Sequence, residues 1–174
     1  IPKRSTVNFT STNALFKNVN GTGFVKITND IVSQEGGACD AGIFGDIDND
    51  GKMDLFVTNG STGSLTNNYL YRNITQNAGN YITIKLRGCT LNKSAIGARI
   101  KIVTGNLKQM REISGGISSQ SMLWQHFGLG NASIIDSVFV FWTTGNVQIL
   151  TNVKINQNLT ITECPVGILN NQIP

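Results

Sequence analysis

The sequence is poor in the residue types that catalysis most often uses. Only 14% of its 174 residues are charged, and it has a single histidine and three widely separated cysteines. No serine lies in a G-x-S-x-G turn, and no phosphate-binding loop or catalytic pair of carboxylates emerges. The histidine, His126, lies in the segment HFGLG, which we interpret as a structural turn between strands. These absences argue against an enzyme.

Long apolar runs and helix-forming residues are also scarce. No apolar run approaches the roughly 20 residues that cross a bilayer, and residues 1–4 contain neither an initiator methionine nor a signal-peptide core. We therefore expect a processed or excised, soluble chain without a membrane span. Asn, Thr, Ser and Gly are abundant whereas Ala, Leu, Glu and Lys are few, a balance that favours strands and turns. The sequence predicts an all-β protein.

Basic residues are spread thinly, but acidic residues are concentrated in one stretch. The net charge is +4, yet half of the ten acidic residues fall within fifteen positions, at Asp40, Asp46, Asp48, Asp50 and Asp54. Carboxylates packed so closely repel one another unless a cation neutralises them, so the cluster indicates a metal site. No basic run with interleaved aromatic residues is present, which argues against nucleic acid as a partner.

The strongest motif is the segment DIDNDGKMD at residues 46–54, in which acidic residues alternate before Gly51. Calcium takes about six to eight oxygen ligands, and alternate side chains of a tightly coiled loop point inward. We therefore predict a Ca²⁺ site. The predicted ligands all lie in this loop and offer oxygen atoms: the side chains of Asp46, Asp48, Asp50 and Asp54, and the backbone carbonyl of Lys52.

The acidic segment allows two alternatives to a calcium loop between strands. An EF-hand requires a glutamate at the twelfth position, where this sequence has Val57, and flanking helices, whereas residues 42–45 and 55–57 have the composition of strands. We therefore predict a calcium loop that joins two strands. The other alternative is a solvated acidic turn without a metal.

One segment occurs twice in the first half of the chain. The sequence NALFKN at residues 13–18 returns as NYLYRN at residues 68–73, with the shared order leucine, aromatic, basic, asparagine. Between the copies lie short apolar runs at residues 24–27, 41–44 and 55–57, separated by turn residues. The pattern predicts a four-stranded β unit followed by the opening strand of the next unit.

The second half of the chain has a different pattern, with alternating or short apolar runs that predict about seven strands, the number expected of a small antiparallel β-sandwich. Tight hairpin turns are expected at residues 104–106 and 144–146. The chain is therefore divided into four parts: an N-terminal strand or arm (1–12), a calcium-binding β unit (13–79), a β-sandwich (80–164) and a tail or linker (165–174).

The three cysteines, Cys39, Cys89 and Cys164, are too far apart for a zinc knuckle or a redox pair. In an extracellular chain they predict one disulfide and one leftover thiol. Cys89 closes the strand-like run 81–87 and Cys164 closes the run 159–163, so we favour this pair, provided that the first and last strands of one sheet lie side by side in parallel. The alternative is three buried, reduced cysteines.

Several motifs resemble known families. The segment GIFGDIDNDGKMDLFVTN at residues 42–59, with the flanking LFKN and LYRN segments, resembles an FG-GAP or VCBS repeat. Such repeats form β-propeller blades that hold calcium in this loop. The resemblance therefore implies a propeller-blade-like calcium-binding β unit, packed on or linked to the sandwich.

The downstream segments AIGARI at residues 95–100, HFGLG at 126–130 and VFW at 140–142 resemble the ASPIC/UnbV domain. That domain follows FG-GAP repeats in secreted proteins such as the cartilage acidic protein group. The resemblance implies a secreted or cell-surface protein that acts in extracellular binding or adhesion, with no assigned catalytic activity.

Other residues offer weaker signals. Trp124 and Trp142 are candidates for stacking on sugars, although tryptophans in a small β domain more often belong to the core or its edge. Of seven Asn-x-Ser/Thr sites, Asn20 and Asn59 lie in turns and are the better candidates for glycosylation.

Three functions stay open. The first is a calcium-binding module that binds a protein or glycan at a surface. The second is a structural subunit whose residues 6–10 add a strand to a neighbouring copy of itself. The third is a carbohydrate-binding or hydrolase-associated domain.

Overall fold

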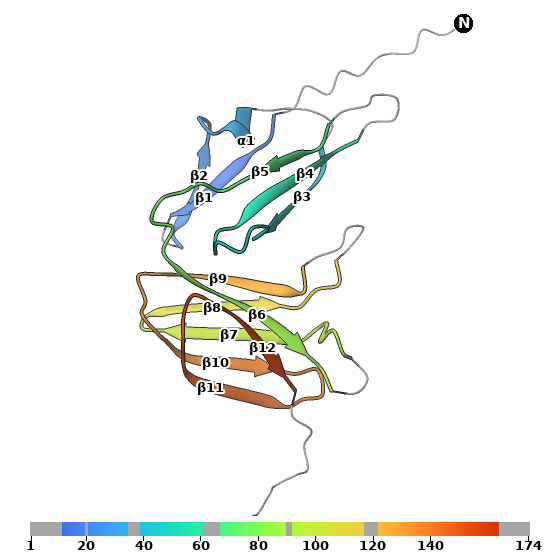
Figure 1. Cartoon of the computed structure of the whole chain (residues 1–174), viewed down its shortest axis with the longest axis vertical. Coiled ribbons are helices and arrows are strands. Elements are labelled where there is room, and N and C mark those ends of the chain that lie inside the picture. Colours follow the sequence, from blue (N-terminus) through green and yellow to red (C-terminus); the bar gives the residue numbers. More distant parts are fainter. Residues whose placement is uncertain are drawn as a thin grey trace, which may run out of the picture. The chain divides into compact units, whose positions relative to one another are not determined.

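The computed structural model describes six stretches of the chain: residues 12–19, 21–34, 39–60, 67–89, 92–116 and 122–163. The chain divides into two compact units, Ile1–Ile74 and Thr75–Pro174. The described elements are twelve β-strands and one short α-helix (Figure 1). The predicted all-β fold is confirmed.

The N-terminal unit contains a hairpin and a separate three-stranded sheet. The hairpin pairs β1 (Leu15–Val19) with β2 (Gly23–Ile27). The antiparallel sheet has the order β3 (Cys39–Gly45), β4 (Asp54–Asn59), β5 (Tyr69–Tyr71). The prediction of one four-stranded unit is therefore wrong, because among the described strands β1 and β2 pair only with each other. Local apolar patterns locate strands but do not encode which distant strand becomes the partner.

Between the hairpin and this sheet, the chain forms a one-turn helix that was not predicted from the sequence. Helix α1 (Ile31–Gln34) follows Asp30, whose Oδ1 accepts a hydrogen bond from Val32 N at 2.9 Å. The backbone carbonyl of Asp30 accepts a second hydrogen bond from the Ser33 hydroxyl. Asp30 is thus an N-cap, and it supports a helix too short to give a periodic signal.

The C-terminal unit contains the predicted number of strands, arranged in two sheets. Their bounds are β6 (Asn80–Arg87), β7 (Arg99–Thr104), β8 (Leu107–Glu112), β9 (Trp124–Gly130), β10 (Ile135–Phe141), β11 (Val147–Val153) and β12 (Gln157–Thr162). One sheet has the order β11-β10-β7-β8 and the other β12-β6-β9. All pairs are antiparallel except β6 with β12, which run in parallel.

The core of this unit follows from the alternation of buried and less buried residues, which is clearest along β7 and β10. The largest fully buried side chains of the unit are those of Phe127, Ile82, Ile84, Ile100, Ile102, Ile113, Ile135, Val138 and Val140. Removing apolar surface from water is the main stabilising contribution to such a fold. Trp142 is also buried in this core, whereas Trp124 is 36% exposed.

Both predicted hairpin turns are present, and one other turn prediction is wrong. Gly105 and Gly145 have φ values of 53° and 92°, and they connect β7 to β8 and β10 to β11. The segment HFGLG, interpreted from the sequence as a turn between strands, lies inside β9. Phe127 and Leu129 alternate into the core, and this burial outweighs the turn preference of the glycines.

Candidate metal centre

The acidic loop joins β3 to β4 and brings three of the predicted ligands together. Asp46, Asp48 and Asp50 each place one carboxylate oxygen within 4.8 Å of the others. Oxygens that share a calcium ion lie about 2.3–2.6 Å from it, so two of them are separated by no more than about 5 Å. These three carboxylates therefore fit a common calcium ion. Exposure of Asp48 and Asp50 leaves the group open to solvent.

The loop backbone is coiled by its own carboxylates. Asp46 accepts hydrogen bonds from Asp50 N and Gly51 N, both at 3.0 Å, and Asp50 Oδ1 accepts one from Lys52 N at 2.9 Å. Asn49 and Gly51 take φ values of 58° and 84°, a left-handed conformation that asparagine and glycine tolerate best. The sequence thus folds this turn in a way that directs alternate carboxylates to one side.

Two basic side chains partly neutralise the carboxylates. Lys52 Nζ lies 2.8 Å from Asp50 Oδ2, and Arg72 Nη2 lies 2.6 Å from Asp48 Oδ2. The hydrogen bond from the Lys52 side chain, followed by that from its backbone NH, holds the pKa of Asp50 below its usual value. Two cations among three carboxylates leave an excess of negative charge. A divalent cation is therefore complementary to the loop.

The fourth predicted side-chain ligand, Asp54, lies outside the group of three. It is 3% exposed, and its two oxygens accept hydrogen bonds from Ile47 N at 3.0 Å and from Asn73 N at 2.8 Å. A carboxylate oxygen has a second acceptor site, so these bonds leave capacity for a metal. Asp54 and the Lys52 carbonyl stay predictions as ligands.

The second copy of the repeated segment supports the loop, a role that sequence reasoning missed. Strand β5 pairs with β4, and the residues that follow it reach back to the loop. Arg72 forms the ion pair with Asp48, and Asn73 donates from its backbone to Asp54 and from Nδ2 to the Met53 carbonyl at 3.2 Å. The conserved order of residues in the two copies was the available signal. In the second copy, this order of residues marks the segment that supports the acidic loop.

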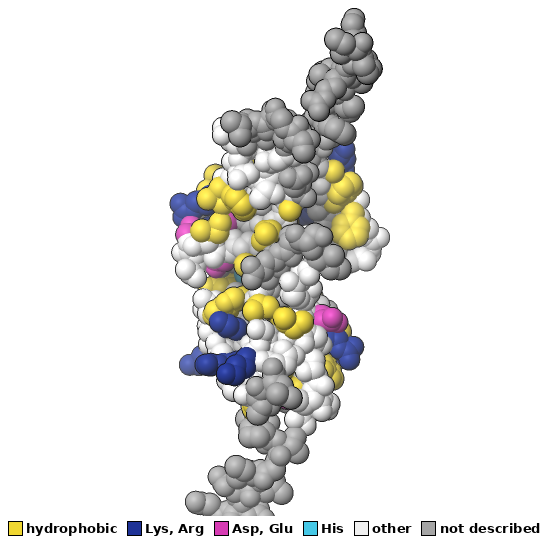
Figure 2. Space-filling model, turned by 90° about the vertical axis from the view of Figure 1, so that its right-hand side faces the viewer, with side chains coloured by type: hydrophobic (Ala, Val, Ile, Leu, Met, Phe, Trp, Pro, Cys, Tyr) yellow, Lys and Arg dark blue, Asp and Glu magenta, His cyan; other side chains and the backbone are white. Residues whose placement is uncertain are grey.

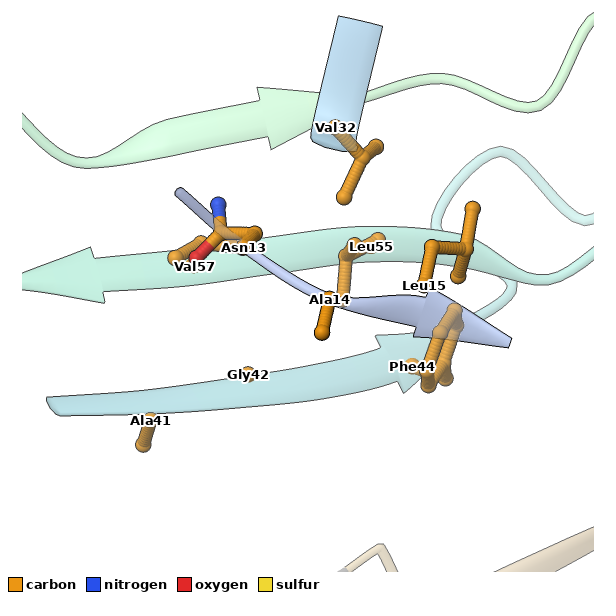
Figure 3. Close-up of a pocket in the computed structure, with 9 residues that line it drawn as sticks. All are labelled: Asn13, Ala14, Leu15, Val32, Ala41, Gly42, Phe44, Leu55 and Val57. Atoms are coloured by element: carbon orange, nitrogen blue, oxygen red, sulfur yellow. The ribbon is translucent and has the colours of Figure 1, made fainter. Parts of the chain in front are cut away.

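An apolar cavity lies beside the same sheet, with a volume of about 340 Å³ (Figure 3). Its lining combines residues from the start of β1, from α1 and from the sheet: Asn13, Ala14, Leu15, Val32, Ala41, Gly42, Phe44, Leu55 and Val57. The buried Nδ2 of Asn13 has no hydrogen-bond partner. None of the lining residues is titratable, so this cavity supplies no acid, base or nucleophile.

The predicted disulfide between Cys89 and Cys164 requires that the strands preceding these residues lie side by side in parallel, and they do. The bond itself stays a prediction. Strands β6 and β12 lie side by side in parallel, with Arg87 opposite Thr162. Among the described residues Cys89 has no disulfide partner, and its Sγ lies 2.9 Å from the Glu163 carbonyl oxygen. Cys164 lies outside the described residues.

The remaining candidate residues have structural contacts. His126 Nδ1 lies 3.2 Å from the Thr83 hydroxyl, and its ring stacks on Tyr81 with 5.5 Å between centroids. Asn20 lies outside the described residues. Asn59 is half-buried, and the Nδ2 atom to which a glycan would be attached donates to the Asn67 carbonyl. Glycosylation at both asparagines stays a prediction.

Family comparisons agree with this arrangement. The model described as an FG-GAP-like repeat matches residues 6–57, which include the acidic loop and β4 as far as Val57. The model described as ASPIC and UnbV matches residues 88–166. The chain carries an FG-GAP-like repeat followed by an ASPIC/UnbV domain. A search of curated proteins gives no match.

The FG-GAP-like repeat thus holds the candidate metal centre, and the ASPIC/UnbV domain spans most of the two packed sheets. FG-GAP repeats commonly bind calcium, and the proteins that contain them are usually extracellular or surface-associated. Within the described stretches, the structure contains no helix with the length and apolar character needed to cross a membrane.

Proposed function

We propose that this chain is a secreted, calcium-binding interaction module without catalytic activity. The observation that supports the proposal most directly is the convergence of three carboxylates, from Asp46, Asp48 and Asp50, within 4.8 Å of one another. The partner is a protein or a glycan at a surface. The ion serves to fix the conformation of the loop and the strands that it joins.

When bound, calcium supplies positive charge that screens the mutual repulsion of the loop carboxylates. The three aspartates hold it, and Asp54 joins them through the free acceptor capacity of its oxygens. Arg72 is 69% exposed at its side chain, so it is able to turn into solvent and leave Asp48 to the ion. Asn73 and Met53 keep the loop attached to the end of β5 through their hydrogen bond.

Binding only to the folded state stabilises it by RT ln(1 + [L]/Kd), about 2.7 kcal/mol at a hundredfold excess of calcium over Kd. For a unit of the size of Ile1–Ile74, a change of 1 kcal/mol in the free energy of unfolding shifts the melting temperature by about 4–8 °C. Circular dichroism should therefore show an upward shift of about 10–20 °C in millimolar calcium relative to EDTA, and a smaller shift in magnesium.

Asp48→Asn should remove most of this shift, because it deletes a ligand charge from an exposed loop position. Asp136→Asn is the matched control: it makes the same chemical change in the C-terminal unit, far from the loop in sequence, and should keep the shift. Equal calcium shifts in the Asp48→Asn variant and the unaltered chain would contradict the proposed site.

A second candidate function, assembly by strand exchange, is favoured by the edge of β1. This strand contains the first copy of the repeated segment, and among the described strands it pairs only with β2. The second copy, β5, pairs with β4. No other described strand covers the second edge of β1, which is thus available to a strand from another chain. Sedimentation velocity should then detect oligomers that grow with concentration, whereas a monomer at all concentrations would contradict assembly. Residues 6–10, the predicted connector, lie outside the described residues.

A further inference from the structure

The outer face of the β11-β10-β7-β8 sheet carries cationic and apolar side chains together. On β7, Ile100 and Ile102 point into the core, so Arg99 and Lys101 point outward. On β10 the outward residues are Phe139 and Phe141, which stand opposite Lys101 and Arg99 respectively. This alternation is the ordinary consequence of the strand period, and it defines an outward surface that we call the basic face.

The pairing of neighbouring strands extends the basic face across all four strands. One row holds Val147, Phe141, Arg99 and Glu112, the next holds Ile149, Phe139, Lys101 and Met110, and the third holds Thr151, Ser137, Val103 and Lys108. Val147, Ile149 and Met110 are 54%, 56% and 50% exposed. In Figure 2, hydrophobic side chains lie beside Lys and Arg on the C-terminal unit, with an acidic side chain next to them. Exposed aliphatic side chains in adjacent rows are typical of an interaction surface.

The cations of the basic face, Arg99, Lys101 and Lys108, outnumber its one acid, Glu112, which stands opposite Arg99. Residues 75–174 contain eight Lys and Arg against three Asp and Glu, a net charge of +5, whereas residues 1–74 contain six against seven. Of the three acids, Glu163 is buried and accepts a hydrogen bond from Thr144, and Asp136 accepts one from Gly105 N. Both ion pairs found among the described residues lie in the N-terminal unit. An anionic partner is therefore complementary to the charge of this face.

The aromatic rings of the basic face are already engaged by its cations. Lys101 Nζ lies 5.6 Å from the ring centroid of Phe139, and Arg99 Cζ lies 5.8 Å from that of Phe141. Sugars bind proteins largely by stacking on free aromatic faces, which these rings do not offer. Exposed valine, isoleucine and methionine side chains instead match the apolar side chains of another protein. The combination favours an acidic protein segment over an anionic glycan.

We propose that the basic face docks a protein segment in which Asp or Glu residues alternate with apolar residues. Arg99 and Lys101 are two residues apart on one strand, which corresponds to about 7 Å, the spacing of alternate carboxylates in an extended segment. Lys108 lies on β8 opposite Val103, the next outward position of β7, so the third cation is displaced by one strand from the line of Arg99 and Lys101. This inference rests on the proposed interaction role and names the partner class, but it does not require calcium.

The test is fluorescence anisotropy with the full chain and a short fluorescein-labelled peptide of alternating Glu and Leu. The peptide should bind, and Lys101→Glu should weaken binding about tenfold or more by placing like charges together. Ile149→Ser should weaken it several-fold by removing apolar contact. Lys93→Glu reverses an exposed cation in the turn after β6, outside the four strands that form the basic face, and serves as the matched control that should bind normally. Unchanged tryptophan-monitored melting curves establish that the variants are folded.

Three results would overturn the inference. One is no binding of the Glu-Leu peptide, a second is equal binding by the Lys101→Glu variant and the unaltered chain, and a third is binding only to heparin fragments or to vesicles containing phosphatidylserine. A Lys-Leu peptide should not bind under any condition. The calcium melting shift separates this inference from the proposed function: a normal shift without peptide binding overturns only the docking surface, and peptide binding without a calcium shift overturns only the metal site.

Discussion

Replacing Asp54 with alanine should destabilise the N-terminal unit even when no calcium is present. The carboxylate is buried, and its oxygens accept hydrogen bonds from Ile47 N and Asn73 N. A buried NH group left without a hydrogen-bond partner lowers stability by about 1–3 kcal/mol. The substitution leaves two such groups, so the free energy of unfolding should fall by no more than about 2–6 kcal/mol. Ile47 is 56% exposed, which lets water reach its backbone. The expected loss in the free energy of unfolding is therefore about 2–4 kcal/mol.

The assay is urea unfolding in EDTA, followed by two signals. Both tryptophans, Trp124 and Trp142, belong to the C-terminal unit, so tryptophan fluorescence reports on that unit alone. Far-ultraviolet circular dichroism reports on both units. The Asp54→Ala variant should lower the midpoint of the dichroism transition of the N-terminal unit and leave the fluorescence transition unchanged.

The matched control is Asp48→Asn, which alters an exposed carboxylate of the same loop. Its ion pair with Arg72 lies at the surface, where such pairs contribute about 0–1 kcal/mol. In EDTA this variant should unfold almost like the unaltered chain. If Asp54→Ala also unfolds normally in EDTA, then the two backbone hydrogen bonds carry no stability and the reasoning is refuted.

Three further predictions concern other parts of the chain. Gly51→Ala should destabilise the loop by about 1–2 kcal/mol, because its φ of 84° strains a residue with a side chain; an unaltered melting curve in EDTA would contradict this. Phe127→Ala should lower the stability of the C-terminal unit by about 3–5 kcal/mol through loss of a fully buried ring, and the tryptophan-monitored transition should register it. Mass spectrometry of the unreduced, oxidised protein should find a peptide linking Cys89 to Cys164, and recovery of both as alkylated thiols would exclude the disulfide.

The strands and the acidic loop were predictable because their signals are local. Alternation within single strands located β6, β7 and β10, and the spacing of carboxylates before Gly51 located the turn that gathers three of them. The family resemblance rested on the same local segments and is confirmed by the matches at residues 6–57 and 88–166.

Features that depend on distant contacts were not predictable in the same way. Asp54 was assigned as a ligand, but its hydrogen bond from Asn73 comes from a residue 19 positions later, which only the fold brings near. The separation of β1 and β2 from the β3-β4-β5 sheet likewise depends on the choice of strand partners. The error at HFGLG has another cause: glycine has a strong local preference for turns, and tertiary burial of Phe127 overrides it.

The most direct test of the calcium site is isothermal titration of the EDTA-stripped, dialysed chain with calcium, combined with elemental analysis of the same sample. We predict one calcium ion bound per chain and no binding by a variant carrying Asp46→Asn, Asp48→Asn and Asp50→Asn together, with its tryptophan-monitored unfolding unchanged. The site would be contradicted by the absence of binding heat in a sample that elemental analysis shows to be free of calcium, or by equal binding in the triple variant.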